Sequence, residues 1–153
     1  QIQADWDLEV GDMTAGAEPQ SSPRGRPLEV IVRDLVRTYV IRKTEARTRI
    51  SWEAFRKGQL DEHRAQDFRK RYEKVCEDLF LAVRGRRHRE AFVAYLAETI
   101  GSVPQYLPEA DLVALNRALQ GENWSDVRAL VLLATAAVSG LPRETQADGE
   151  ATQ

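Results

Sequence analysis

The sequence has very little of the residues that build disulfide-linked or metal-stabilised folds. It contains one cysteine, Cys76, among 153 residues, and two histidines, His63 and His88. A disulfide framework within one chain and a cysteine-rich zinc site are therefore excluded. Neither histidine has a partner at metal-ligand spacing, because the sequence contains no HExxH motif and no cysteine pair. We expect no bound metal and no cofactor.

Catalytic motifs are missing as well. The sequence contains neither a phosphate-binding GxxxxGK[ST] loop nor a nucleophile elbow. Cys76 lies in an apolar pattern at helical spacing, which favours a small core residue over a nucleophile. The acid pairs Asp61–Glu62 and Glu77–Asp78 consist of adjacent residues, which point to different sides of a helix, so helix capping and surface pairing explain them better than acid–base chemistry. We therefore expect a protein that is not an enzyme.

Long apolar runs are also absent. The longest largely apolar run, Ala129 to Val138, is too short to cross a bilayer and is typical of a buried helix. The first residues, QIQADWDLEV, lack the basic-then-apolar order of a signal peptide. We expect a cytoplasmic protein without membrane contact. Because the chain does not begin with methionine, we also expect a fragment, a processed chain or the product of an internal start.

What the sequence has in abundance is charge, and the charge is unevenly distributed. The formal net charge is only -2, and the first twenty residues carry acids but no lysine or arginine. Between Arg33 and Arg89 lie seventeen of the 22 lysines and arginines, against nine acids. Such a local excess attracts phosphate, and arginine binds phosphate with a planar, two-pronged donor. The central half of the chain is therefore a candidate polyanion-binding region.

Composition divides the chain into three parts. Residues 1–26 combine acids with glycine, proline and serine, which predicts a flexible acidic tail or linker. Docking of this segment on a partner through Trp6 and Leu8 is the alternative. Residues 27–140 carry apolar side chains at spacings of three and four, which predicts a helical bundle domain. Residues 141–153 are polar and predict a second flexible tail.

Helix-start and helix-stop residues divide the domain into about five helices and a short turn. The predicted segments run from Pro27 to Thr48, Trp52 to Lys57, Glu62 to Arg84, His88 or Arg89 to Ile100, Pro108 to Gly121, and Asn123 or Ser125 to Val138. Ser51 and Asp61 are the expected N-caps, and Gly85 is expected to end its helix in the left-handed conformation. The predicted core of the last segment consists of Val127, Leu130, Val131, Leu133, Ala134 and Val138. No segment has strand periodicity, so the fold class is all-α, a bundle with short connections and roughly antiparallel neighbours.

The cations of the central half form a candidate nucleic-acid-binding surface, densest in the turn after Arg84. The candidate residues are Arg42, Lys43, Arg47, Arg49, Arg56, Lys57, Arg69, Lys70, Lys74, Arg84, Arg86, Arg87 and Arg89. Contacts with phosphate carry no base information, so sequence-specific reading is not expected. Two alternatives stay open: a solvated surface, and a helical protein–protein scaffold whose basic face binds an acidic partner, including the chain's own N-terminal segment.

Three segments of the domain also support a comparison with a known family. They are LVRTYVIRKTEART (residues 35–48), RYEKVCEDLFLAVRGRRHREAFVAYLAETIGSVPQYLP (71–108) and WSDVRALVLLATAAVSG (124–140). Together they resemble the C-terminal helical region of the large subunit of type I CRISPR effector complexes (Cascade), in the type I-B-related branch. The resemblance covers about Leu28 to Gly140. It depends most on the basic LFLAVRGRR turn followed by ETIGSVPQYLP, and not on a catalytic signature.

The resemblance implies a role and a set of partners. Such helical regions also occur as separate small subunits that line the complex beside the guide RNA and help to hold the opened target DNA. The implied function is a non-catalytic, small-subunit-like component that supports RNA-guided target DNA binding and R-loop stabilisation, since guide pairing supplies the specificity. The implied partners are the backbone and large subunits of Cascade, the guide RNA and the target DNA, with more than one copy per complex.

Overall fold

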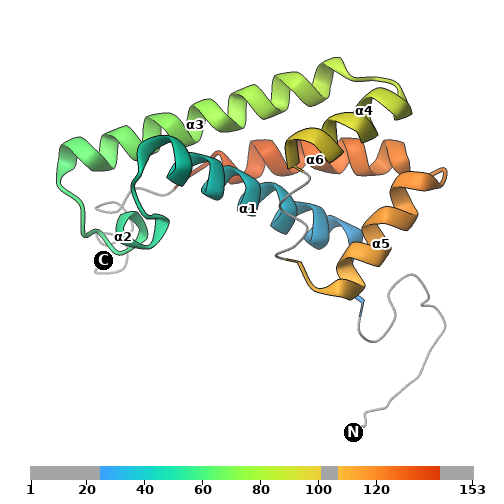
Figure 1. Ribbon diagram of the computed structural model, residues 1–153, viewed down its shortest axis with the longest axis horizontal. Coiled ribbons are helices and arrows are strands. Elements are labelled where there is room, and N and C mark those ends of the chain that lie inside the picture. Colours follow the sequence, from blue (N-terminus) through green and yellow to red (C-terminus); the bar gives the residue numbers. More distant parts are fainter. Residues whose placement is uncertain (1–24, 101–106, 142–153) are drawn as a thin grey trace, which may run out of the picture.

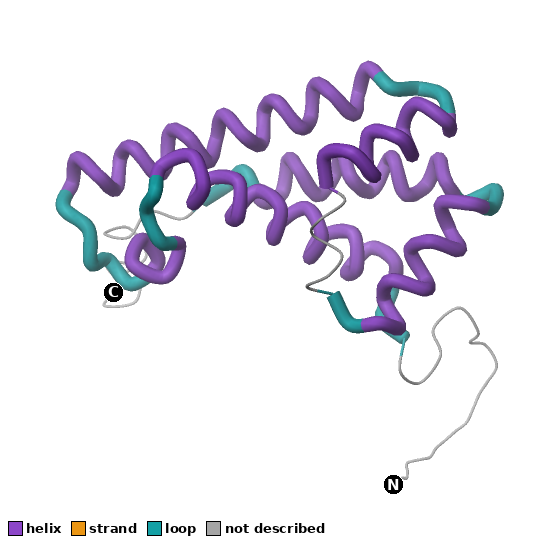
Figure 2. The backbone as a smooth tube through the Cα atoms, viewed as in Figure 1, coloured by secondary structure: helices purple, strands orange, loops and turns teal. Residues whose placement is uncertain are grey.

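The computed structural model describes residues 25–100 and 107–141, and the predicted tails fall outside these ranges apart from residues 25, 26 and 141. The helices are α1 (Leu28–Thr48), α2 (Trp52–Arg56), α3 (Glu62–Gly85), α4 (Arg89–Tyr95), α5 (Glu109–Gln120) and α6 (Trp124–Val138). A π-helical segment, η1 (Leu96–Ile100), continues α4. No strand occurs in the described residues, as Figure 2 shows. The prediction of an all-α bundle is confirmed.

Three long helices, α1, α3 and α6, pack against one another and form the body of the bundle. In Figure 1, α3 runs antiparallel to α1, while α6 returns in roughly the same direction as α1. The shorter α5 packs against α1 and α6, and α4 packs against α6. Each pair of long helices therefore leaves one groove on the outside of the bundle, and these grooves carry different side chains.

The core lies where the apolar stripes of the three long helices meet. Leu35 and Val36 of α1, Phe68 and Leu79 of α3, and Val131 of α6 are almost completely buried. On α3 the buried residues Phe68, Tyr72, Val75 and Leu79 recur at spacings of three and four, so they share one side of the helix, as the sequence predicts. Burying a side chain of this size contributes about 1.5–3 kcal/mol, so the three helices stabilise one another.

Side chains fix two helix starts where the sequence predicts them. The Ser51 hydroxyl accepts a hydrogen bond from the Ala54 N–H at 3.1 Å, and the Asp61 carboxylate accepts one from the Arg64 N–H at 2.8 Å. Each such cap contributes about 1 kcal/mol. They place the beginnings of α2 and α3, and the turn between these helices passes through Gly58 at a φ of 69°.

The end of α3 differs from the prediction. Gly85 is the last helical residue and does not adopt a positive φ; Arg86 leaves the helix in an extended conformation with φ -103° and ψ 91°. A left-handed glycine is not needed, because Arg128 of α6 donates to the carbonyls of Arg84 and Arg86 at 2.9 and 2.8 Å. The left-handed residue is Arg49 instead, which ends α1 at a φ of 61°.

One predicted core residue is wrong. Leu133 is 67% exposed, whereas Val127, Val131 and Ala134 of the same helix are buried. Two residues beyond Val131, Leu133 is rotated to the opposite side of α6, away from α1 and α3. In an almost wholly apolar helix the sequence does not mark which side faces inward.

A partly buried ion pair joins the start of the bundle to α5. Arg26 donates through Nε to the carboxylate of Asp111 at 3.0 Å and also contacts Asp34 of α1 at 2.7 Å. Asp111 is only 2% exposed, so the ion pair with Arg26 is needed to offset the cost of burying this carboxylate. Arg26 falls in the predicted N-terminal tail, and the periodic pattern offers no signal for a pair 85 residues apart.

Candidate nucleic-acid interface

A groove of about 600 Å³ runs between the C-terminal end of α1 and the N-terminal half of α3. It is lined by Arg47, Thr48, Ile50, Asp67, Lys70, Arg71 and Lys74. We call it the basic groove, because four of these side chains are cations and one is a carboxylate. Its local field is therefore positive although the whole chain is slightly acidic.

Helix geometry explains how the groove collects these charges. Asp67, Lys70, Arg71 and Lys74 follow one another at spacings of three and four, so they share one face of α3. The antiparallel α1 ends opposite this face and adds Arg47 (Figure 1). Lys70 and Lys74 are separated by about 6 Å along the helix axis, a distance spanned by about two stacked nucleotides.

Most of the groove's charge is left uncompensated by the described residues. Arg47, Lys70 and Arg71 make no ion pair with any residue that the structure describes. Lys74 lies 3.5 Å from Asp78, but both side chains are more than half exposed, and such pairs contribute little. The groove's own carboxylate, Asp67, lies 3.6 Å from His63. The cations are thus available to an external anion.

The arginine-dense turn between α3 and α4 has a different arrangement. Arg86 donates to the Ala82 carbonyl at 2.9 Å, and its guanidinium lies 4.4 Å from the centre of the Tyr95 ring. Arg89 donates through Nε to the Leu119 carbonyl of α5 at 3.1 Å. The other two arginines of the turn, Arg84 and Arg87, are exposed. The four predicted binding residues do not form one cation cluster.

The remaining candidates are divided between ion pairs and aromatic contacts. Arg56 and Lys57 both contact Glu53, at 2.7 and 3.2 Å, and their hydrogen bonds lower the pKa of that carboxyl. Arg42 contacts Glu45 at 3.3 Å. These pairs neutralise part of the basic surface near α2.

Two further candidates lie against rings. Lys43 lies 5.9 Å from the centre of the Tyr39 ring, and Arg69 lies 5.3 Å from that of Phe55. The Nε atom of Arg69 is buried and lacks a hydrogen-bond partner among the described atoms. Both side chains are half-buried, so they are less available than the groove cations. Arg49, by contrast, is exposed at the end of α1.

Two cations were not predicted as important: one lines the groove, and the other is a residue of α6 that contacts the turn. Arg71 lies in the groove beside Lys70, and only the placement of α1 against α3 reveals it. Arg128 is the structural cation that binds the two carbonyls at the end of α3. The only available signal for Arg128 was that it is the single cation of a largely apolar helix.

Other chemistry has little support in the described residues. Cys76 is buried in the core, as predicted, and burial raises the pKa of its thiol to about 12, with a smaller contribution from Glu73. A group with that pKa is protonated at neutral pH and is a poor nucleophile. In residues 25–100 and 107–141 no three histidine, cysteine or acidic side chains gather as metal ligands would. Over the same ranges no helix combines the length and apolarity of a transmembrane span.

The family comparison covers most of the chain. Residues 8–138 match the family described as the type I-B CRISPR Cas8b C-terminal domain. The chain has no significant match among curated proteins or among solved structures. The matched range contains α1 to α6 and both sides of the basic groove. It confirms the resemblance drawn from the three sequence segments: this chain belongs to the type I-B Cas8b C-terminal domain family and is a component of type I-B CRISPR Cascade.

Proposed function

We propose that this chain is a non-catalytic, small-subunit-like component of Cascade that binds the phosphate backbone of nucleic acid in the basic groove. In this role it supports RNA-guided target DNA binding and stabilises the R-loop. The guide RNA, the target DNA and neighbouring Cascade subunits are its partners, with more than one copy in a complex, in the cytoplasm.

The observation that carries the proposal is the uncompensated charge of the groove. Arg47, Lys70 and Arg71 come from two helices, open on one groove and have no ion-pair partner among the described residues. A polyanion that enters the groove releases its condensed counterions, which favours binding at low salt. Contacts between these cations and phosphates carry no base information, which suits a subunit that leaves specificity to guide pairing.

A salt titration with matched variants tests this proposal. The groove variant carries Arg47→Gln, Lys70→Gln and Lys74→Gln. The control variant carries Arg84→Gln, Arg87→Gln and Arg117→Gln, three exposed cations outside the groove. Binding of single-stranded DNA is measured by fluorescence anisotropy over a range of salt concentrations.

The groove variant should bind more weakly, and the slope of log K against log salt should fall by about 2. The control should stay within about twofold of the wild type at physiological salt, because its cations do not line the groove. Equal losses in the two variants would show that only overall charge matters. Salt-independent binding of the wild type, or binding only to an acidic protein, would overturn the proposal.

A further inference from the structure

A second cleft, on the α1/α6 side of the bundle, combines arginines with aromatic rings. It has a volume of about 300 Å³. We call it the aromatic cleft; its main lining residues are Arg33, Arg37, Trp52, Tyr72, Val138 and Leu141. Neither arginine is among the predicted binding residues, and no carboxylate is among the described residues that line the cleft. The cleft therefore favours a ligand with an apolar body and a negative charge.

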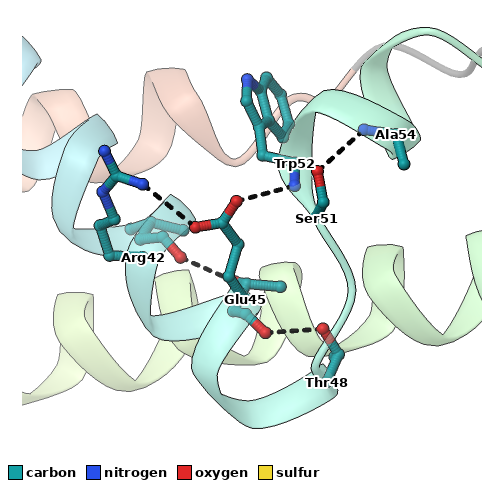
Figure 3. A network of polar contacts seen from close by, with 8 residues as sticks. Arg42, Glu45, Thr48, Ser51, Trp52 and Ala54 are labelled. Carbon is teal, nitrogen blue, oxygen red and sulfur yellow. Dashed lines mark hydrogen bonds and ion pairs between the residues drawn. The ribbon is translucent and has the colours of Figure 1, made fainter.

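Trp52 is held in place as a rigid platform. Its backbone N–H donates to Oε2 of Glu45 at 2.8 Å, and Oε1 of the same carboxylate accepts from Arg42 (Figure 3). Its ring lies 5.9–6.1 Å from the rings of Phe55, Phe68 and Tyr72. The side chain is nevertheless only half-buried. A ring that is fixed by its neighbours yet partly exposed loses little entropy when a flat ligand stacks on it.

Arg33 and Arg37 place two positive charges along the same cleft. They are one helical turn apart on α1, and both are exposed. Arg33 reaches Glu29 only at 3.9 Å, with both side chains largely in solvent, which is a weak pair. Arg37 has no ion-pair partner in the described part of the chain. Both guanidinium groups can therefore turn to a phosphate.

The polar groups of the cleft floor are already used. The Tyr72 hydroxyl donates to the Val138 carbonyl at 2.9 Å, which ties α3 to the end of α6. The remaining floor is apolar, formed by Val138 and Leu141. A base in the cleft would find a stacking surface but few partners for its hydrogen-bonding edge. Such a cleft accepts any base, as stacking platforms for single strands do.

From these contacts we propose that the aromatic cleft binds one unstacked nucleobase of a single-stranded nucleic acid. The base stacks on Trp52, and Arg33 and Arg37 hold the adjoining phosphate. This inference rests on the proposed function, because it assigns a second contact to the strand that the basic groove holds. Binding in the groove alone would be purely ionic, whereas stacking in the cleft makes the affinity depend on the presence of a base.

The test compares two oligonucleotides with equal charge and different bases. One is an oligothymidine of about 15 nucleotides, and the other is an abasic strand of the same length. The unaltered 153-residue chain should bind the oligothymidine about tenfold more tightly, because stacking of one base is lost in the abasic strand. Trp52→Leu should remove this difference and leave abasic binding unchanged. Oligocytidine and oligoadenine should bind about as tightly as oligothymidine.

A second variant guards against unfolding, because Trp52 packs on core rings. Arg37→Gln changes an exposed side chain. It should weaken binding of the oligothymidine several-fold more than that of the abasic strand, because only a strand with a base seated in the cleft brings its phosphate to Arg37. Circular dichroism and urea titration establish that both variants are folded. Two results would overturn the proposal that the cleft binds a base. One is equal affinity of the wild type for the two strands, and the other is an equal loss of affinity for both strands in Trp52→Leu.

The groove variant distinguishes a failure of the cleft proposal from a failure of the proposed function. With Arg47, Lys70 and Lys74 replaced by glutamine, both strands should bind more weakly by the same factor. If the wild type binds both strands equally and the groove variant weakens both, only the cleft proposal is lost. If neither strand binds the wild type, both proposals are lost.

Discussion

The basic groove and the α3–α4 turn each contain four cations of the central half, but they use them in opposite ways. In the groove, three of the four have no ion-pair partner among the described residues. In the turn, Arg86 and Arg89 donate to carbonyls of the same chain. Arginine density along the sequence is highest in the turn, but two of its four arginines are held by backbone carbonyls of the same chain.

For the cations of α3, the difference follows from their position relative to the end of the helix. The last carbonyls of a helix lack intrahelical partners and attract donors, so cations near the end of α3 are drawn to backbone oxygens. The groove cations of α3 lie nearer the middle of that helix, where the carbonyls are already paired. They extend into solvent, and an external phosphate competes with water alone.

Replacing Arg128 gives the largest expected effect on stability and tests the structural role of cations that bind carbonyls at the end of α3. Arg128→Met removes two charge-assisted hydrogen bonds, to the carbonyls of Arg84 and Arg86. The free energy of unfolding should fall by about 2–3 kcal/mol, measured by urea titration. Arg117→Met, an exposed change on α5, is the control and should stay within about 0.5 kcal/mol. If Arg128→Met instead lowered only the affinity for nucleic acid and left stability unchanged, Arg128 would be a binding residue and not a structural one.

Replacing Arg89 should have an intermediate effect. Arg89→Met removes one partly buried hydrogen bond to the Leu119 carbonyl, which links the start of α4 to the end of α5. The expected loss of unfolding free energy is about 1 kcal/mol. The neighbouring Arg87→Met provides the control, since that side chain is exposed. If Arg87→Met destabilises the protein as much as Arg89→Met, the hydrogen bond from Arg89 to the Leu119 carbonyl does not account for the loss of stability.

Most of the helical fold could be predicted from the sequence, because the signals are local. The caps at Ser51 and Asp61 act within three residues, and the apolar stripe of α1 is visible in one helix alone. The prediction failed at Leu133, where an almost wholly apolar helix has no polar face to orient it. It also failed at Gly85, where a donor from α6, Arg128, replaces the usual glycine ending.

The site was less predictable, because it depends on packing between distant segments. Arg47, Lys70 and Lys74 were identified as cations, but their grouping in one groove requires α1 to lie along α3. Arg71 follows Lys70 directly in the sequence, and whether it lines the groove depends on its rotation around the axis of α3 relative to α1. The partner of Arg89 is a carbonyl 30 residues away, which no local pattern reveals.

The smallest expected effect concerns repulsion within the groove, and it tests the comparison most directly. Arg47 of α1 lies across the groove from three cations of α3, and these like charges repel, so added sodium chloride should stabilise the wild type by screening them. The gain should be a few tenths of a kcal/mol, or about 1 °C in the thermal midpoint. Lys70→Gln should raise stability at low salt and reduce the salt dependence, while weakening nucleic-acid binding.

Arg87→Gln removes the same charge from the turn and serves as the matched control for that measurement. Because Arg87 is exposed beside cations that are turned inward, its removal relieves less repulsion, and the salt dependence should stay close to that of the wild type. If Arg87→Gln abolished the salt dependence as fully as Lys70→Gln, the repulsion would belong to the whole basic half. If the repulsion belongs to the groove, the salt dependence should fall in Lys70→Gln and not in Arg87→Gln. A phosphate bound in the groove would then offset the same repulsion.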